Sequence, residues 1–279
     1  MSESLKPIPD DRRVLVFMNQ KGGVAKTTSV INIGDNLARK GYKVLLIDLD
    51  PQANLTSNFI EEELENTVFE ELKLFSSQAA GSDHSFDLLM TRENLYLLPS
   101  DISLAGIDPY INAAMEPNKV LLQIIRRIKA RKFFDFILVD CPPNLGALPR
   151  NALTAAELLF IPVTPEPFPV KGLRQLQETI ELIRENLNPR LRIDGIIITR
   201  VEGAGRVYSN FIKSISEEYS DRVLKPYVRK NCRISEAQEA HRTVFEHDPS
   251  CNGVEDYAGL TDTILDVVLD GGKNNNEQI

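Results

Sequence analysis

The sequence predicts an α/β protein built on a single doubly wound, mostly parallel sheet flanked by helices. Short, wholly apolar runs that are typical of buried parallel strands recur along the chain, and segments with helical spacing separate them. No internal repeat and no stretch rich in proline or glycine divides the 279 residues. We therefore expect one domain over residues 14–270, preceded by a flexible segment (1–13) and followed by a disordered tail (271–279).

The first two strands and the helix between them form one unit. Residues 14–18 (VLVFM) predict a buried strand, and residues 43–50 (KVLLIDLD) predict a second strand that ends in acidic residues. Between them lie a loop, residues 19–28, and a helix over residues 29–40 that stops before Gly41. A strand–helix–strand unit of this kind is the building block of a parallel sheet.

The later elements alternate in the same way. The other expected strands are 94–99, 136–140, 158–163 and 193–199. The other expected helices are 121–130, 170–186, 209–219, 235–240 and 257–269. Residues 61–71 hold six glutamates and no basic residue, which predicts a solvated helix face.

Composition excludes several classes of protein. With 42% hydrophobic and 26% charged residues the chain is neither disordered, collagen-like nor a coiled coil as a whole. Its net charge of −8 argues against a protein coated in nucleic acid but permits a local basic patch. Three cysteines without metal or redox spacing, no signal peptide, and no apolar run of about 18 residues predict a cytoplasmic protein without a membrane span.

The loop after the first strand has the features of a phosphate-binding loop. A loop that joins a buried strand to a helix gathers backbone N–H groups and the positive end of the helix around one point. Residues 21–28 read KGGVAKTT, so that Lys26 can reach the β- and γ-phosphates and the Thr27 hydroxyl can hold Mg²⁺. The common G-x-x-x-x-G-K-[ST] pattern fails at both fixed glycines, where Gln20 and Ala25 stand.

This loop resembles the deviant Walker A sequence of the ParA/MinD ATPases. Three further motifs resemble the ParA/Soj partition branch: LLIDLDPQAN (45–54), ILVDCPP (137–143) and VRKNCRISEA (228–237). The four motifs occur in the expected order, and the resemblance covers residues 14–260. It implies the deviant Walker P-loop fold, with ATP and Mg²⁺ as cofactors and a homodimer that forms on ATP. The sequence also lacks the N-K-x-D motif that recognises a guanine base, which favours ATP over GTP.

The resemblance implies a role for each matching residue. Lys26 would bind phosphate, Lys21 would reach the partner's phosphates across the dimer, and Asp50 would position the attacking water. The nucleotide would lie on Lys21, Gly22, Gly23, Val24, Ala25, Lys26, Thr27 and Thr28. Mg²⁺ would be held by Thr27, supported by Asp48, and bound through water by Asp140. Ala25 and Ala53 stand where most relatives carry glycine, so the backbone there must adopt a conformation that an L-residue can hold.

Residues 200–233 have an excess of basic side chains. They hold eight lysines and arginines against four acidic residues, a net charge of +4, which leaves −8 − 4 = −12 for the rest of the chain. On composition alone these are scattered, solvated side chains. The resemblance favours instead non-specific binding to DNA phosphates by the ATP-bound dimer. The candidate contacts are Arg200, Arg206, Arg229 and Arg233.

The resulting hypothesis is a slow, partner-stimulated ATPase that binds the nucleoid and segregates chromosome or plasmid DNA with a ParB-type protein. An alternative is the positioning of a protein cargo. A membrane-cycling regulator like MinD would need a basic amphipathic C-terminal helix, whereas residues 266–272 (DVVLDGG) are acidic. An electron-transfer ATPase like the nitrogenase iron protein would need a second cluster cysteine in each subunit, and Cys141 has no such partner in the sequence. An ATP-dependent clamp without hydrolysis is disfavoured by the acids at 48, 50 and 140.

Overall fold

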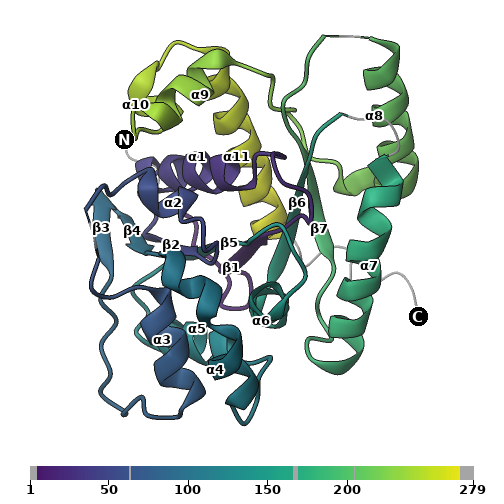
Figure 1. Ribbon diagram of the computed structural model, residues 1–279. Coiled ribbons are helices and arrows are strands. Elements are labelled where there is room, and N and C mark those ends of the chain that lie inside the picture. The colour runs from purple at the N-terminus through teal and green to yellow at the C-terminus, as the bar shows by residue number, and fades with distance from the viewer. Residues whose placement is uncertain (1–4, 63, 166–168, 204, 271–279) are drawn as a thin grey trace.

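A single, mostly parallel sheet forms the centre of the molecule (Figure 1), as the sequence predicts, and it has seven strands where six were predicted. The computed structural model describes residues 5–62, 64–165, 169–203 and 205–270. The strands run in the order β3-β4-β2-β5-β1-β6-β7, and only the edge strand β3 is antiparallel to its neighbour. Their bounds are β1 (Val14–Phe17), β2 (Val44–Asp48), β3 (Leu89–Arg92), β4 (Leu95–Leu98), β5 (Phe136–Asp140), β6 (Leu158–Val163) and β7 (Ile193–Ile198).

Helices follow most of the strands and cover both faces of the sheet. Their bounds are α1 (Lys26–Arg39), α2 (Asn54–Ser57), α3 (Val68–Ser76), α4 (Asp108–Ala113), α5 (Val120–Ala130), α6 (Ala147–Ala155), α7 (Pro169–Asn186), α8 (Arg206–Tyr219), α9 (Cys232–Glu239), α10 (Val244–His247) and α11 (Asn252–Asp270). Two short 3₁₀ helices, η1 (Ile102–Gly106) and η2 (Ser220–Arg222), complete the regular structure of the described residues. In that part of the chain no helix is both long and apolar enough to cross a membrane.

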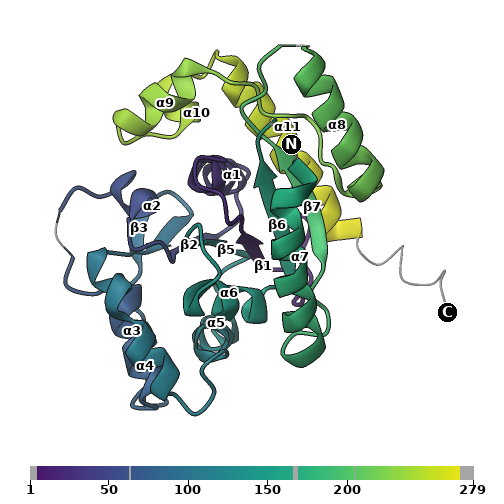
Figure 2. The same ribbon diagram turned by 45° about the vertical axis from the view of Figure 1, so that its right-hand side comes forward.

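The core has two parts, one on each face of the sheet. Leu15 and Phe17 of β1 pack with α1 and α11, whereas Val14 and Val16 pack with α5, α6 and α7 on the opposite face. This alternation follows from the period of two in an extended strand. Figure 2 shows α1 on one side of the strands and α5 and α6 on the other. The sheet is therefore buried on both faces, which explains why its strands are wholly apolar.

Helix α1 lies unusually close to the sheet, and a glycine permits this. A Cβ atom at Gly34 would lie only 2.7 Å from Cδ2 of Leu46 on β2, which is too close for any real Cβ contact. A larger residue would force either the Leu46 side chain or the helix to move, because the space between them is already filled. The packing of α1 thus fixes where its N-terminus lies relative to the ends of the strands.

The structure differs from the predicted elements between residues 61 and 98, and it adds helices that were not predicted, among them α4 and α6. Strand β3 was not predicted, because its four residues (LMTR) are partly exposed and lack the apolar character of the central strands. Residues 61–66 are not helical where they are described; α3 starts at Val68, after a capping box formed by Thr67 and Glu70. Glu71 is buried rather than solvated, and one of its carboxylate oxygens lies 2.7 Å from Nε2 of His84.

The two terminal segments fall partly outside the described residues. Residues 1–4 and the predicted disordered tail, 271–279, are among those not described. Residues 5–13 form no strand or helix, but they make definite contacts: Ile8 is buried, and the Arg13 backbone N–H donates to Glu157 at 2.7 Å. The part of the predicted flexible segment that is described is therefore attached to the domain.

Candidate functional site

The carboxyl ends of the parallel strands meet at one edge of the sheet, and the predicted site residues gather there. Asp48 ends β2 and is paired in register with Asp140, which ends β5; Asp140 is in turn paired with Phe17, just before the phosphate loop. A cavity of about 890 Å³ opens at this edge. Ligands in open α/β sheets bind outside the carboxyl ends of strands, so this cavity is the candidate site.

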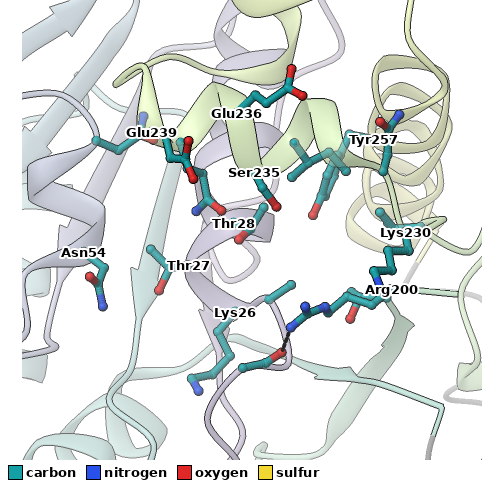
Figure 3. Close-up of a pocket in the computed structure, with 18 of the residues that line it drawn as sticks. Lys26, Thr27, Thr28, Asn54, Arg200, Lys230, Ser235, Glu236, Glu239 and Tyr257 are labelled. Atoms are coloured by element: carbon teal, nitrogen blue, oxygen red, sulfur yellow. Dashed lines mark hydrogen bonds between the residues drawn. The ribbon is translucent and has the colours of Figure 1, made fainter.

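Figure 3 shows the walls of this cavity. Lys26, Thr27 and Thr28 follow one another along α1, and the side chains of Ser235, Glu236 and Glu239 project from α9 above them. Arg200 and Lys230 lie on the side opposite Asn54. Asp50 also lines the cavity, whereas Asp48 and Asp140 lie beneath its floor, fully buried.

The phosphate loop folds back on itself through Lys26. Its Nζ donates to the Lys21 carbonyl oxygen at 3.1 Å, and the side chain is almost completely buried. Burial lowers the pKa of Lys26, and the nearby Asp140 carboxylate opposes that shift. Lys21 itself is exposed, with its backbone N–H bound to Asn19 Oδ1 at 3.0 Å. The loop therefore presents one buried and one exposed lysine at the same edge of the sheet.

Thr27 and Asp140 form the buried polar contact beneath the loop. The Thr27 hydroxyl donates to Oδ2 of Asp140 at 2.6 Å, while Oδ1 of Asp140 is buried without a hydrogen-bond partner. Burial and the adjacent Asp48 raise the pKa of Asp140 well above its usual range. A buried carboxylate oxygen without a donor is costly, and a cation or a cation-bound water would relieve that cost.

Asp48 and Asp50 have different surroundings although they are two residues apart. Both carboxylate oxygens of Asp48 already accept hydrogen bonds, Oδ1 from the Asp50 N–H at 3.0 Å and Oδ2 from the N–H and hydroxyl of Thr56. Burial raises the pKa of Asp48 to about 6. Oδ1 of Asp50 accepts from the Gln52 N–H at 2.9 Å, and its side chain reaches the cavity. Asp48 thus shapes the turn that places Asp50.

Both alanines that replace a family glycine are in the left-handed region. The φ angle is +59° at Ala25 and +52° at Ala53, each the residue immediately before a helix. Alanine adopts this conformation at a cost of about 1–2 kcal/mol, whereas glycine adopts it freely. The backbone is thus strained at two positions, one in the phosphate loop and one in the turn after Asp50.

Several of the described basic side chains of residues 200–233 are paired with acidic side chains in the single chain. Arg229 donates to Asp256 and Glu255, Arg233 to Glu236 with Asp248 3.4 Å away, and Lys230 pairs with Glu202. Four of these acids lie beyond the segment, and their four negative charges cancel its net charge of +4: Glu236, Asp248, Glu255 and Asp256.

The four candidate DNA contacts lie in different environments. Arg200 donates to the phosphate loop, at the Gly23 carbonyl oxygen, and Arg229 lines the same cavity. The Arg233 side chain is 51% exposed. Arg229 is paired with Asp256, whose side chain is only 4% exposed. Arg206 begins α8, and its side chain lies outside the described residues.

Sequence reasoning missed two parts of the site. Thr199 follows β7, and its hydroxyl contacts the carbonyl oxygens of Val24 and Val163, both at 3.1 Å. The rule that ligands bind at the carboxyl ends of parallel strands could have found it, because Thr199 directly follows a predicted strand. Helix α9 forms a wall of the cavity, although it lies about 200 residues after the phosphate loop in the sequence. Residues 228–237 were matched to a family motif, but that match gave α9 no role at the nucleotide site.

Comparison with known proteins supports one family. The model of the AAA domain family matches residues 12–193. The chromosome partitioning protein ParA of Caulobacter vibrioides is 33% identical over 254 residues, which cover 91% of this chain and 94% of that one. The chromosome-partitioning ATPase Soj of Treponema pallidum is 35% identical over 256 residues, covering 91% of this chain and 97% of its own.

A solved structure gives the same fold with a nucleotide in place. Cobyrinic acid a,c-diamide synthase from Mycobacterium smegmatis, with bound ATP analog and magnesium, superposes with a TM-score of 0.75 at 31% identity. The match covers 91% of this chain and 94% of that one. Together with the loop, the strand-end acids and the sheet order, these matches show that the chain is an ATP-binding P-loop ATPase of the ParA/Soj chromosome-partitioning family.

Proposed function

We propose that this chain binds ATP with Mg²⁺, dimerises on ATP, binds DNA without sequence preference, and segregates DNA with a ParB-type partner. One observation carries the nucleotide part of the proposal. Lys26, Thr27 and the unpartnered Oδ1 of Asp140 meet at one edge of the sheet, below a cavity of about 890 Å³. A phosphate chain and its cation need this combination of ammonium, hydroxyl and carboxylate groups.

The residues present fit a magnesium ion. Asp140 supplies a buried carboxylate oxygen that lacks a donor, and Thr27 supplies the adjacent hydroxyl oxygen. Oxygen donors of this kind are what Mg²⁺ prefers. Asp48 would support the ion indirectly, through the turn that it holds. Bound Mg²⁺ would neutralise charge that develops on the phosphates.

We assign the catalytic work to three side chains of the chain itself. Asp50, which reaches the cavity, orients the water that attacks the terminal phosphate. Lys26 holds the phosphates from within the loop, and exposed Lys21 reaches those of a second chain. Since Lys21 completes the site only in a dimer, we expect slow hydrolysis that a partner protein accelerates.

DNA binding is proposed for the ATP-bound dimer, and Arg233 is its best candidate contact. The Arg233 side chain is 51% exposed and its Glu236 partner 41%, so a DNA phosphate can replace the carboxylate at little cost. Arg229 is the weakest candidate, because its Asp256 partner is almost fully buried and would be left unpaired. A dimer doubles the number of such contacts.

The proposed cellular role is nucleoid-associated segregation of DNA that carries a ParB-type protein, which would stimulate hydrolysis and so release the dimer. Membrane cycling is the weaker alternative. Tyr257, Leu260 and Ile264 of α11 are fully buried in the core, so the main apolar face of this helix packs against the domain itself.

The proposal is tested by binding to a random-sequence DNA duplex at low and moderate salt, with ATP, with ADP and without nucleotide. An Asp50→Ala variant holds the ATP state. We expect binding that requires ATP, weakens steeply with salt, and persists in the variant. ATP binding without any DNA binding would refute the DNA part and favour a protein scaffold as the site of action.

A further inference from the structure

Arg200 occupies a turn that the structure holds firmly on both sides. It follows β7 with a φ of +54°, a left-handed conformation that is uncommon for a residue with a long side chain. Thr199 is held by its two contacts with Val24 and Val163. Val201 is held by backbone hydrogen bonds with Val228 at 3.1 Å and Lys230 at 3.0 Å. A strained backbone persists only where its surroundings impose it.

This turn directs the guanidinium to the phosphate loop. Nη1 of Arg200 donates to the Gly23 carbonyl oxygen at 3.0 Å, as Figure 3 shows beside Lys26. Gly23 has a φ of +76° and lies at the bend of the loop. The Val24 carbonyl oxygen accepts from Thr199 and the Lys21 carbonyl oxygen from Lys26. Side chains therefore hold three carbonyl groups of this short loop.

These contacts bear on how the loop binds an anion. A loop cradles a phosphate with its N–H groups, and each carbonyl that is fixed on the outside limits rotation of the peptide that supplies the next N–H. The peptide between Gly23 and Val24 is fixed in this way by Arg200. We infer that Arg200 is a positioning residue for the phosphate loop, and that it acts on the β-phosphate site through the Gly23 carbonyl group.

The inference replaces the DNA contact expected of Arg200. Arg200 lines the nucleotide cavity and also an adjoining hollow of about 510 Å³ whose wall includes Glu202 and Tyr208. Its guanidinium thus lies between the loop and the segment that leads to α8. The inference rests on the nucleotide-binding part of the proposed function and not on DNA binding.

Isothermal titration calorimetry of Mg-ATP and Mg-ADP tests the inference, with Arg200→Met, Arg200→Lys and Arg200→Gly. We expect Arg200→Met to raise the Kd of both nucleotides about tenfold with unchanged stoichiometry and melting temperature. Arg200→Lys should restore part of the affinity, because an ammonium group can still donate to the carbonyl. Arg200→Gly should weaken binding as much as Arg200→Met, although glycine suits the left-handed backbone. In hydrolysis, KM should rise while kcat changes less than about threefold.

Arg174→Met is the control, since it removes an exposed positive charge on α7 away from the cavity. An equal loss of affinity in this control, or unchanged Kd values in Arg200→Met, would overturn the inference. A lower number of binding sites at unchanged Kd would also overturn it, because it indicates a merely structural role. So would weaker binding of ATP with unchanged binding of ADP, because it indicates direct contact with the γ-phosphate.

DNA binding at saturating ATP separates this inference from the broader proposal. Arg200→Met should then bind a random-sequence duplex as the wild-type chain does. A variant with wild-type nucleotide affinity and impaired DNA binding would make Arg200 a DNA contact and overturn the inference. If the wild-type chain bound no nucleotide, the proposed function itself would fail, and the inference with it.

Discussion

The nucleotide edge of the sheet and the basic segment, residues 200–233, differ in how far their sequence predicts their structure. At the sheet edge, residues far apart in the chain meet because parallel strands end together, as Asp48 and Asp140 do in adjacent register. In the basic segment, charge was counted along the chain, but the acids that pair with Arg229 and Arg233 lie beyond the segment, from three residues (Glu236) to 27 residues (Asp256) further on. The topology of a parallel sheet thus predicts where a strand-end motif lies in space. A count of charges along a segment does not predict which of them are paired with acids outside the segment.

The largest effect is expected at Lys26, which tests the sheet edge. Lys26→Met removes the buried ammonium that holds the loop and that we propose binds the phosphates. We expect ATP affinity to fall by about 100-fold or more, measured by calorimetry, because a charge-assisted contact in a buried site is lost. Lys40→Met at the other end of α1, where Nζ pairs with Asp262, is the matched control. Similar affinity in the two variants would contradict the assignment.

Asp256 tests the account of the basic segment. Asp256→Asn weakens the acceptor for Arg229, so urea unfolding should show a loss of about 1–3 kcal/mol. The freed guanidinium should strengthen DNA binding by the ATP-bound protein and steepen its salt dependence by about 0.9 per added phosphate contact. Asp262→Asn, which alters an exposed pair on the same helix, should change neither quantity. Unchanged DNA affinity in Asp256→Asn would show that the ion pair with Asp256 is not what keeps Arg229 from binding DNA phosphates.

The strained alanines offer a smaller test within the nucleotide edge. Ala25→Gly should raise the free energy of unfolding by about 0.5–1 kcal/mol, because glycine tolerates the φ of +59°. Ala38→Gly lies in the regular part of α1 and should lower it by about 1 kcal/mol. Chemical denaturation without nucleotide measures both. Destabilisation by Ala25→Gly would mean that the left-handed turn is not strained.

The smallest effect concerns Glu71, another charge whose surroundings the sequence did not reveal. Burial raises the pKa of Glu71, so the folded chain binds its proton more tightly than the unfolded chain does. Stability from this group is therefore present at low pH and lost as pH rises through the raised pKa. Relative to the wild type, Glu71→Gln should gain stability as the pH rises through the raised pKa, by less than about 1 kcal/mol because the variant also alters the contact with His84. Exposed Glu65→Gln should show no such trend; a parallel trend would remove the burial argument.

Most of the fold could be predicted because its central strands are buried on both faces. Their apolar runs appear directly in the sequence, and helix α1 was predicted to within three residues at its start. Strand β3 was missed because an exposed edge strand needs no apolar face. Residues 61–66 were expected to be helical from their glutamates. The helix begins only after Thr67, because the capping box at this residue sets its N-terminus.

The same distinction applies to the site. Lys26, Thr27, Asp50 and Asp140 were predicted because each lies in a motif at the end of a strand, and the structure brings them to one edge. The contact of Arg200 with the phosphate loop spans 177 residues and depends on a turn of positive φ. Neither the residue type nor its neighbours in the sequence indicate that contact.

The central claim is that ATP joins two chains at this edge, and sedimentation velocity tests it most directly. With ATP, the Asp50→Ala variant should sediment as a particle of twice 31.3 kDa, and with ADP or no nucleotide as one of 31.3 kDa. Adding Lys21→Ala to that variant should leave ATP binding intact but keep the chain monomeric. A 31.3 kDa particle with ATP bound in the Asp50→Ala variant would contradict the account.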